Sequence, residues 1–589
     1  MNDAPIGLSP QNPDSPPGLS GRALVRRLLA RLAPQRAWMA GGVALALLAA
    51  VAAIGLMALS GWFIAAMAVA GATGAAINYY TPAAAIRACA LARSGGRYGE
   101  RVVTHEATLR GLAGLRAWLF RRLIPLAPAR LSALRSGELF ARLRADIDAL
   151  EHFYLTVLVP SVVAAGAVVV VLALSALVLP AAVPMLLLGV VLAGVLLPLW
   201  IRRRAQRDAA ESVTEAALLR GQLLDAVRGH DDLLAWGEVS AHAGRIDALA
   251  ERLGRRRSRI ERWQAIGGGL AGMLAQLTLV AVLVVAVAAL RSGALAPASL
   301  VMLALLTLAL FEVIAPLPEA LGQWHATLRA GARVFMLADL PAPFVEPQRS
   351  APVPAAPAIA FQNVRLRYSD DAPWALDGVD LTLPAGTCLA VVGASGAGKS
   401  SLLAALLKLY PVQDGGVLFG GQPLAALHGD VLRRRIAVIA QQTTLFNASL
   451  RENLLLAAPA AEAAALARAV HLAQLEAFVA ALPQGYDTVL GEAGAQVSGG
   501  EARRIAIARA LLQDAPVLAL DEPTEGLDAR TARDLYAALA TAARGRTVLL
   551  ITHRVGGLAA LVDEVAVMER GRIVARMPVD EYVARERDC

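Results

Sequence analysis

A glycine-rich stretch between a strand-like run and a helix-like run carries the most specific chemistry in this sequence. Residues 393–401 read Gly-Ala-Ser-Gly-Ala-Gly-Lys-Ser-Ser, which fits the pattern G-x-x-x-x-G-K-[ST]. The apolar run at 388–392 is typical of a strand, and residues 402–407 are typical of a helix start. Glycines here let successive backbone N–H groups point at phosphates, at the positive end of the following helix. The stretch therefore predicts a binding site for ATP or a close relative.

The residues predicted to bind ATP lie in this loop and just after one earlier strand. Lys399 is expected to reach the β- and γ-phosphates, and Ser400 is expected to hold Mg²⁺. Tyr368 follows the alternating strand at 359–366 and is expected to stack on adenine. The predicted ATP-binding residues are Tyr368, Gly393, Ala394, Ser395, Gly396, Ala397, Gly398, Lys399, Ser400 and Ser401.

Polar residues further along the chain complete the predicted catalytic centre. Gln441 follows an apolar run and is expected to coordinate Mg²⁺ or the attacking water. A buried-strand run at 517–520 ends in Asp521, which suits the Mg²⁺ shell, and Glu522, which can polarise the attacking water. His553 follows the next apolar strand and is expected to contact the γ-phosphate. The predicted catalytic residues are thus Glu522, His553 and Gln441, and the predicted Mg²⁺ ligands are Ser400, Gln441 and Asp521.

A second helix start, at residues 498–501, is also predicted to bind a phosphate. Ser498, Gly499, Gly500 and Glu501 precede a helix rich in Ala and Arg, so their hydroxyl and N–H groups are expected to face a phosphate. A lone Gln or His is more often structural. Here, however, five elements follow one another in the order and spacing of an ATP site, which argues against a glycine-rich turn that binds nothing.

Composition divides the chain into a membrane part and a soluble part. The 589 residues are 57% hydrophobic and only 17% charged, and every apolar stretch near membrane-spanning length lies before residue 321. The net charge of +9 comes with Arg clusters that flank apolar segments, which is the positive-inside pattern of membrane proteins and argues against nucleic-acid binding. Three cysteines give no paired framework, so a structural disulfide is not expected.

The apolar segments predict six membrane spans with both chain ends in the cytoplasm. They lie near 38–69, from 82 onward, 155–179, 181–200, 266–290 and 298–317. The predicted domains are a disordered tail at 1–20, a transmembrane domain at 21–335, a Pro- and Ala-rich linker at 336–357 and a nucleotide-binding domain at 358–589.

These motifs together resemble the ATP-binding cassette transporters. Residues 497–501, Val-Ser-Gly-Gly-Glu, are similar to the signature of that family, with Val and Glu in place of the commoner Leu and Gln. The resemblance implies a multidomain membrane protein, with an all-α six-helix transmembrane domain of the type IV exporter kind before an α/β P-loop ATPase domain. It also implies that two cassettes close head to tail, each ATP lying between one P-loop and the partner's signature, so a single cassette implies a dimer.

Motifs in both parts of the chain are similar to those of the CydC subunits of bacterial CydDC exporters. That resemblance implies a multi-pass protein of the bacterial inner membrane, with its ATPase domain in the cytoplasm and a CydD-like partner. It further implies export of cysteine and glutathione, or a role with haem, in cytochrome bd assembly. The motifs are Leu59-Ser-Gly-Trp-Phe63, Arg97-Tyr-Gly-Glu-Arg101 with His105, Ser136-Gly-Glu-Leu139, Asp146-Ile-Asp148 and Asp521-Glu-Pro-Thr-Glu-Gly-Leu-Asp528.

A cationic stripe follows the second span. Arg93, Arg97, Arg101 and His105 are spaced by four, so they share one face of a helix. Imidazole can ligate haem iron and guanidinium can pair with propionates, so His105, Arg101 and Arg97 are a candidate site for haem b. The same face suits the carboxylates of glutathione. The structural alternative is a helix that has left the bilayer, with a solvated charged face.

Two further functions stay open at this point. One is a haem-sensing or haem-delivery ATPase that moves no thiol. The other is a homodimeric exporter of lipids or drugs, against which the Ser-Gly-Trp-Phe element and the Arg and His stripe argue.

Overall fold

Long apolar runs in the first part of the chain fold as helices, and the remainder folds as strands and helices around two sheets. The structure is a computed structural model that describes residues 21–132, 142–491, 497–525, 529–553 and 558–588. The described residues form two compact units: those of 21–122 and 142–339, and those of 340–588 together with a short segment at 123–132. The tail predicted at 1–20 lies outside the described residues.

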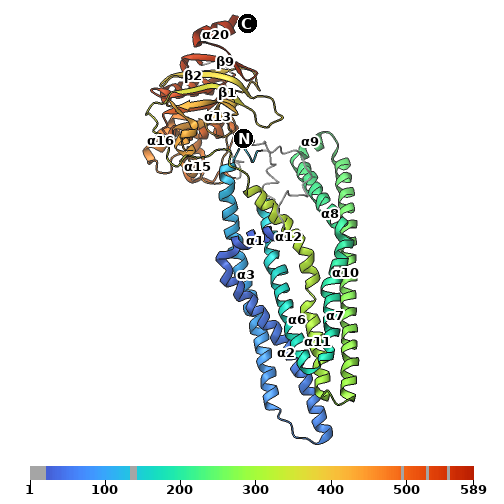
Figure 1. Ribbon diagram of the computed structural model, residues 1–589. Helices are drawn as coiled ribbons and strands as arrows, with labels where there is room; N and C mark the ends of the chain where they lie inside the picture. Colours follow the sequence, from blue (N-terminus) through green and yellow to red (C-terminus); the bar gives the residue numbers. More distant parts are fainter. Residues whose placement is uncertain (1–20, 133–141, 492–496, 526–528, 554–557, 589) are drawn as a thin grey trace, which may run out of the picture. The chain divides into compact units, whose positions relative to one another are not determined.

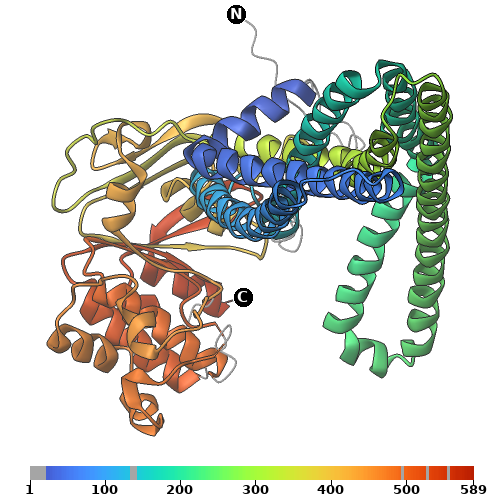
Figure 2. The ribbon, with the colours of Figure 1, turned by 90° about the horizontal axis from the view of Figure 1, so that it is seen from below.

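The first unit is helical (Figure 1). Figure 2 shows the hairpin of α8, α9 and α10, in green, extending away from the other helices of this unit. Its helices are α1 (Gly21–Leu32), α2 (Arg36–Thr73), α3 (Tyr80–Leu123), α5 (Ile147–His152), α6 (Val159–Val178), α7 (Val183–Val191), α8 (Leu197–Arg228), α9 (His230–Ala235), α10 (Val239–Arg291), α11 (Pro297–Ile314) and α12 (Leu317–Ala338).

Five helical segments of this unit, among the described residues, are long and apolar enough to cross a membrane. They are Gly21–Thr73, Arg144–Val178, Pro180–Arg228, Val239–Arg291 and Pro297–Ala338. The predicted helical membrane region is therefore confirmed. The second of the six predicted spans falls in α3, which has 44 residues but carries an arginine at almost every turn from Arg93 onward, so that span stays a prediction.

The helices of this unit pack through small residues. Gly61 of α2 is buried, and a Cβ there would meet Leu305 Cδ1 of α11 at 2.6 Å, so a larger residue would require the Leu305 side chain to move. Asp146 is buried and pairs with Arg333 of α12, and Asp148 accepts a hydrogen bond from Arg116 of α3. Two of the motifs outside the cassette, at 59–63 and 146–148, thus hold helices together.

The second unit has two sheets. A six-stranded sheet has the order β10-β9-β3-β8-β7-β6 and is parallel except for β10, and a four-stranded antiparallel sheet has the order β2-β1-β4-β5. The strands are β1 (Ile359–Leu366), β2 (Leu376–Leu383), β3 (Cys388–Val392), β4 (Asp414–Phe419), β5 (Gln422–Pro423), β6 (Ile436–Ile439), β7 (Val517–Asp521), β8 (Thr547–Ile551), β9 (Glu564–Glu569) and β10 (Arg572–Pro578). The helices are α13 (Lys399–Leu406), α14 (Gly429–Arg434), α15 (Leu450–Leu455), α16 (Ala463–Leu472), α17 (Glu476–Ala481), α18 (Gly499–Leu512), α19 (Ala529–Ala543) and α20 (Val579–Asp588).

The parallel strands position the polar residues of the site. β3, β8 and β7 are neighbours and are nearly continuous apolar runs, because both faces of a central parallel sheet are buried. Their carboxyl ends meet at one edge, where ligands of such sheets bind. The glycine-rich loop follows β3, Asp521 ends β7, and His553 comes two residues after β8. The fold therefore brings together residues that lie up to 160 positions apart in the sequence.

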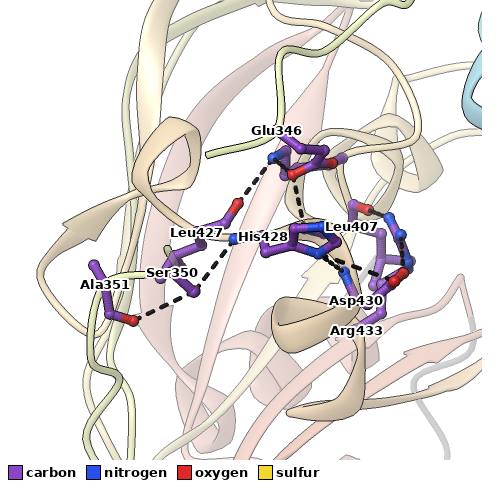
Figure 3. Close-up of polar contacts among 10 residues, drawn as sticks. Glu346, Ser350, Ala351, Leu407, Leu427, His428, Asp430 and Arg433 are labelled. Atoms are coloured by element: carbon purple, nitrogen blue, oxygen red, sulfur yellow. Dashed lines mark hydrogen bonds and ion pairs between the residues drawn. The ribbon is translucent and has the colours of Figure 1, made fainter. Parts of the chain in front are cut away.

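The segment between α12 and β1 is held on the cassette by polar contacts (Figure 3). Glu346 Oε2 accepts hydrogen bonds from Lys408 Nζ and from the backbone N–H of Gly429, both at 2.9 Å. Lys408 is buried, and its ammonium also donates to the Leu427 carbonyl at 2.9 Å. Ser350 Oγ accepts from the His428 N–H at 3.2 Å. Part of the linker predicted at 336–357 thus packs on the cassette, whereas α12 continues to Ala338.

Candidate functional site

The glycine-rich loop has a backbone that other residues cannot adopt without strain. Gly398 has φ of 101°, and a Cβ there would lie 2.1 Å from the Ala375 carbonyl oxygen. Gly393 has φ of 154°, and its Cβ would lie 2.2 Å from the Met568 carbonyl oxygen. Both glycines are therefore required by close backbone approach as well as by conformation. The loop leads into α13, which begins at Lys399.

Lys399 and the hydroxyls after it lie inside this loop. Lys399 is buried, and its Nζ donates to the carbonyls of Gly393 and Ala394 at 2.8 and 2.9 Å. The ammonium is thus drawn across the loop, where it can meet a phosphate. Ser401 Oγ lies 2.8 Å from the Tyr368 hydroxyl. Tyr368 is 48% exposed, and its ring packs edge to face with Tyr410, while stacking on adenine stays a prediction.

Asp521 and Ser400 make an oxygen-rich pocket suited to Mg²⁺. Asp521 is buried, and one carboxylate oxygen, Oδ1, has no hydrogen-bond partner within the described residues. Burial raises the pKa of the Asp521 carboxyl above its usual range, against a hydrogen bond from Ser400 that lowers it. A cation would supply the missing partner, and a carboxylate with a hydroxyl is the donor set that Mg²⁺ prefers. The residues present therefore fit the ion.

Glu522 is held between two of the predicted catalytic residues. His553 Nδ1 lies 2.9 Å from Glu522 Oε1, and Gln441 Nε2 donates to Glu522 Oε2 at 3.3 Å. Burial raises the pKa of the Glu522 carboxyl, but the hydrogen bond and charge of His553, the hydrogen bond with Glu525 and the charge of Lys399 together lower it below its usual value. Glu522 is thus an ionised carboxylate at the end of β7. Gln441 contacts Glu522, and no described contact joins it to Ser400 or Asp521.

Sequence reasoning missed Arg503, which fixes the position of Gln441. This arginine of α18 is buried, and its guanidinium donates to the carbonyls of Ala440 and Gln441 at 2.5 and 2.6 Å. It also lies 3.8 Å from a carboxylate oxygen of Glu525. The sequence gives no signal for this role, because both partners are backbone carbonyls.

Ser498 and Glu501 form a reciprocal cap at the start of α18. The Ser498 hydroxyl accepts from the Glu501 N–H at 3.3 Å and donates to Glu501 Oε2 at 2.7 Å, while the Ser498 N–H donates to the same oxygen at 2.9 Å. Ser498 and Gly499 are at least partly exposed. In the described part of the chain no hydrogen bond or ion pair joins them to the glycine-rich loop, so this helix start is open to a partner molecule.

The arginine stripe lines a cavity on α3. Arg93, Ser94, Arg97, Tyr98 and Arg101, all of α3, line a solvent-open cavity of about 320 Å³ on the surface of this helix. The opposite face of the helix packs on α2, where a Cβ at Gly96 would lie 3.2 Å from Ala49 Cβ. Glycines thus bring α3 against α2 and leave its cationic face exposed.

His105 lies one turn beyond this cavity on the same helix. Its side chain is exposed and makes no described hydrogen bond or ion pair, and it is not among the residues that line the cavity. The structure therefore groups Arg97 and Arg101 with Tyr98 and leaves His105 beside them. Two motifs of the family resemblance, at 136–139 and the end of 521–528, lie outside the described residues in part or in full.

Comparison with known proteins agrees with both parts of the chain. Residues 376–525 match the family described as ABC transporter. The chain is 35% identical over 567 residues to the glutathione/L-cysteine transport system ATP-binding/permease protein CydC of Escherichia coli K12, covering 95% of this chain and 98% of that protein. The chain belongs to the CydC family of ABC transporters. The CydC protein of Haemophilus influenzae is 30% identical over 556 residues, covering 92% of this chain and 95% of its own length.

The fold of this CydC-family chain also matches a solved exporter. A bacterial Atm1-family ABC exporter with ATP bound superposes with a TM-score of 0.83 and 25% sequence identity, covering 94% of this chain and 96% of that one. The chain is therefore an ABC-type exporter subunit: a multi-pass membrane protein that binds ATP with Mg²⁺, hydrolyses it and couples the hydrolysis to transport, together with a second half-transporter.

Proposed function

We propose that the chain pairs with a CydD-like subunit in the bacterial inner membrane and exports a small thiol, cysteine or glutathione, for cytochrome bd assembly. Its ATPase domain lies in the cytoplasm in this proposal. The names of the two CydC relatives support the substrate class, and the cationic cavity on α3 carries the argument in this chain.

The cassette would bind ATP through the glycine-rich loop, with Lys399 on the β- and γ-phosphates and Tyr368 at the base. Ser400, Gln441 and Asp521 would hold Mg²⁺, which neutralises developing charge on the phosphates when bound. Glu522 would orient and polarise the attacking water through its ionised carboxylate. The remaining ATP contacts are assigned to Gly393, Ala394, Ser395, Gly396, Ala397, Gly398 and Ser401.

His553 would hold Glu522 and contact the γ-phosphate. Ser498 with Gly499, Gly500 and Glu501 would close on the ATP of the partner subunit, since this helix start is open to solvent. Closure of the two cassettes would turn the membrane helices outward, and hydrolysis would reset them.

The cavity on α3 would receive the carboxylates of the thiol. Three arginines line it together with Tyr98, and a guanidinium pairs with a carboxylate through two parallel hydrogen bonds. Glutathione has two carboxylates and cysteine has one, so both can be held by this surface. A thiol without a carboxylate would have no partner there.

Haem b is a second candidate ligand, because an exposed imidazole lies next to the same arginines. His105 would hold the iron, and Arg97 and Arg101 would hold the propionates. In this version ATP turnover would serve haem sensing or haem delivery without movement of a thiol.

The test uses the chain purified with its partner in lipid vesicles with the cassettes outside. Uptake of labelled glutathione and of labelled cysteine is measured for the wild type, Arg97→Gln and His105→Ala, with haem absorption spectra alongside. Thiol uptake that needs Arg97 and survives His105→Ala supports thiol export. If the Soret band of the wild type is lost in His105→Ala and no protein takes up a thiol, the result supports haem sensing or haem delivery in place of thiol export. Arg121→Gln is the matched control, since Arg121 is exposed on α3 beyond the cavity.

A further inference from the structure

Two tryptophans meet where the apolar parts of α8 and α10 end. The rings of Trp200 and Trp263 lie edge to face, with centroids 5.6 Å apart and an interplanar angle of 88°. Trp200 is 41% exposed. The two helices are in close contact at this level, because a Cβ on Gly267 would lie 2.2 Å from Ile201 Cδ1. Tryptophan is enriched at membrane–water interfaces, so the pair marks the boundary between hydrocarbon and water on this hairpin.

The guanidinium of Arg204 lies within cation–π distance of both tryptophan rings. The Arg204 guanidinium carbon lies 5.6 Å from the centre of the Trp200 ring and 5.8 Å from that of Trp263. Arg204 is exposed and makes no described hydrogen bond or ion pair, so its N–H donors are available to a ligand in the plane of the membrane surface. A guanidinium at this distance from aromatic rings is attracted to their π-systems while its N–H donors stay free.

The surrounding arginines lack carboxylate partners. Four further arginines near the tryptophans are exposed and, within the described residues, form no ion pair or hydrogen bond. These are Arg202, Arg203, Arg207 and Arg262. Glu261 is the exposed carboxylate next to them, so positive charge dominates at this level.

Further from the apolar segments, part of the charge of the same hairpin is neutralised. Arg256 of α10 pairs with three carboxylates of α8, Asp208, Glu211 and Glu215. Arg259 lies 2.9 Å from Asp208. Arg204 and Arg262 lie four and three residues nearer the tryptophans than this ion-paired cluster, about 5 to 6 Å at 1.5 Å per residue. Their guanidinium groups therefore lie near the expected depth of the phospholipid headgroups.

We propose that the surface formed by Trp200, Trp263, Arg204 and Arg262, with Arg202, Arg203 and Arg207 around it, binds the headgroup of an anionic phospholipid. In the orientation given by the arginine distribution, the lipid lies in the cytoplasmic leaflet. Its phosphate accepts from the guanidinium groups, and its acyl chains lie along the exposed apolar residues below, such as Leu196 and Ile266. The lipid would brace the α8–α10 hairpin. The proposal does not depend on which substrate the protein moves.

The experiment uses the complete transporter, purified with its partner in nanodiscs of phosphatidylcholine with or without phosphatidylglycerol. Lipid that remains bound after transfer to detergent is counted by native mass spectrometry. The test variant is Arg204→Gln/Arg262→Gln, with one change on each helix. The matched control is Arg228→Gln/Arg252→Gln, which removes the same charge from the same two helices at exposed positions further from the tryptophans.

Retention of phosphatidylglycerol is expected to fall about fivefold for each arginine removed in the test variant, with phosphatidylcholine and the control unchanged. Arg203→Gln leaves the tryptophan contacts in place and is expected to lower phosphatidylglycerol retention by one factor of about five. This single variant keeps the test valid if the double variant assembles poorly. Equal losses in test and control, or no loss in either, would overturn the proposal. Displacement of the lipid by soluble glycerol phosphate would also overturn it, because the surface would then bind free phosphate rather than a lipid.

Discussion

The Glu522 carboxylate accepts a hydrogen bond from His553 Nδ1 at 2.9 Å on one oxygen and from Gln441 Nε2 at 3.3 Å on the other. Glu522 also has a φ of 48°, in the left-handed region that residues other than glycine seldom adopt. Its N–H donates to the Ile551 carbonyl at 2.8 Å, which ties this strained turn to β8. Backbone and side chain are thus both fixed, and the carboxylate is positioned by the ends of three strands, β6, β7 and β8.

Replacing Glu522 by glutamine tests its role as the group that polarises water. The amide has nearly the same shape but no charge, so ATP binding is expected to persist. Hydrolysis at this site is expected to fall by at least about 100-fold, the usual worth of a general base. Phosphate release and retention of labelled ATP by the complex are measured together. Loss of ATP binding along with hydrolysis would contradict a purely chemical role.

His553→Ala is expected to shift the pH dependence of hydrolysis. Burial raises the pKa of Glu522, and the hydrogen bond and charge of His553 are the largest of the contributions that lower it overall. Without the imidazole the carboxyl pKa rises, so the group is protonated at a higher pH and the acid limb of the rate profile moves upward. The measurement is the ATPase rate of the complex against pH. A profile that falls in height without moving on the pH axis would show that His553 does not set this pKa.

Arg503→Lys is expected to reduce activity because lysine cannot span two carbonyls. The guanidinium of Arg503 donates to the carbonyls of Ala440 and Gln441 through two separate nitrogens. A lysine ammonium is a single nitrogen on a flexible chain, so it cannot reproduce this two-point contact. Losing a hydrogen bond from a charged donor costs about 1.5 to 3 kcal/mol. We therefore expect a lower midpoint of thermal unfolding and a lower kcat with little change in KM for ATP. Arg504→Lys, on the next position of α18, is the control.

The cassette was largely predictable from sequence, for a physical reason. Buried parallel strands read as unbroken apolar runs, and the polar residue after each run must lie at the same sheet edge, so Asp521, Glu522 and His553 could be placed together. Arg503 could not be placed, because its partners are backbone carbonyls with no sequence signal. The membrane part was predictable where spans are apolar. The arginines of α3 obscured the second span.

Glu346→Gln is expected to weaken the attachment of the linker segment to the cassette. Burial raises the pKa of Glu346, but its hydrogen bonds from Lys408 and Gly429 and the charge of Lys408 lower it overall. A carboxyl with a depressed pKa stabilises the fold above its unfolded pKa, and this stability is lost as the pH falls through the folded value. The wild type should therefore lose part of its thermal stability in acid, below about pH 4.5, the usual pKa of a glutamate.

The Glu346→Gln variant carries no such charge, so its stability should depend less on pH in this range while being lower at neutral pH by about 1 to 3 kcal/mol. Thermal unfolding of the cassette in the complex is followed at several pH values. Asp371→Asn, at an exposed acidic residue for which no described ion pair exists, is the control. Parallel pH curves for the wild type and Glu346→Gln would argue that Lys408 is stabilised by other groups.

If the cavity on α3 binds the thiol, uptake should depend on the charge and shape of its arginine side chains. Arg93, Arg97 and Arg101 line it with Tyr98. If carboxylates are bound there, Arg93→Gln should raise the KM for glutathione by about tenfold or more, the effect of one charged hydrogen bond. Arg93→Lys should recover part of this loss, because it restores charge without the planar fork. Raised salt should weaken uptake by the wild type more than by Arg93→Gln, since an exposed ion pair is screened. Equal salt dependence in both proteins would place the carboxylates elsewhere.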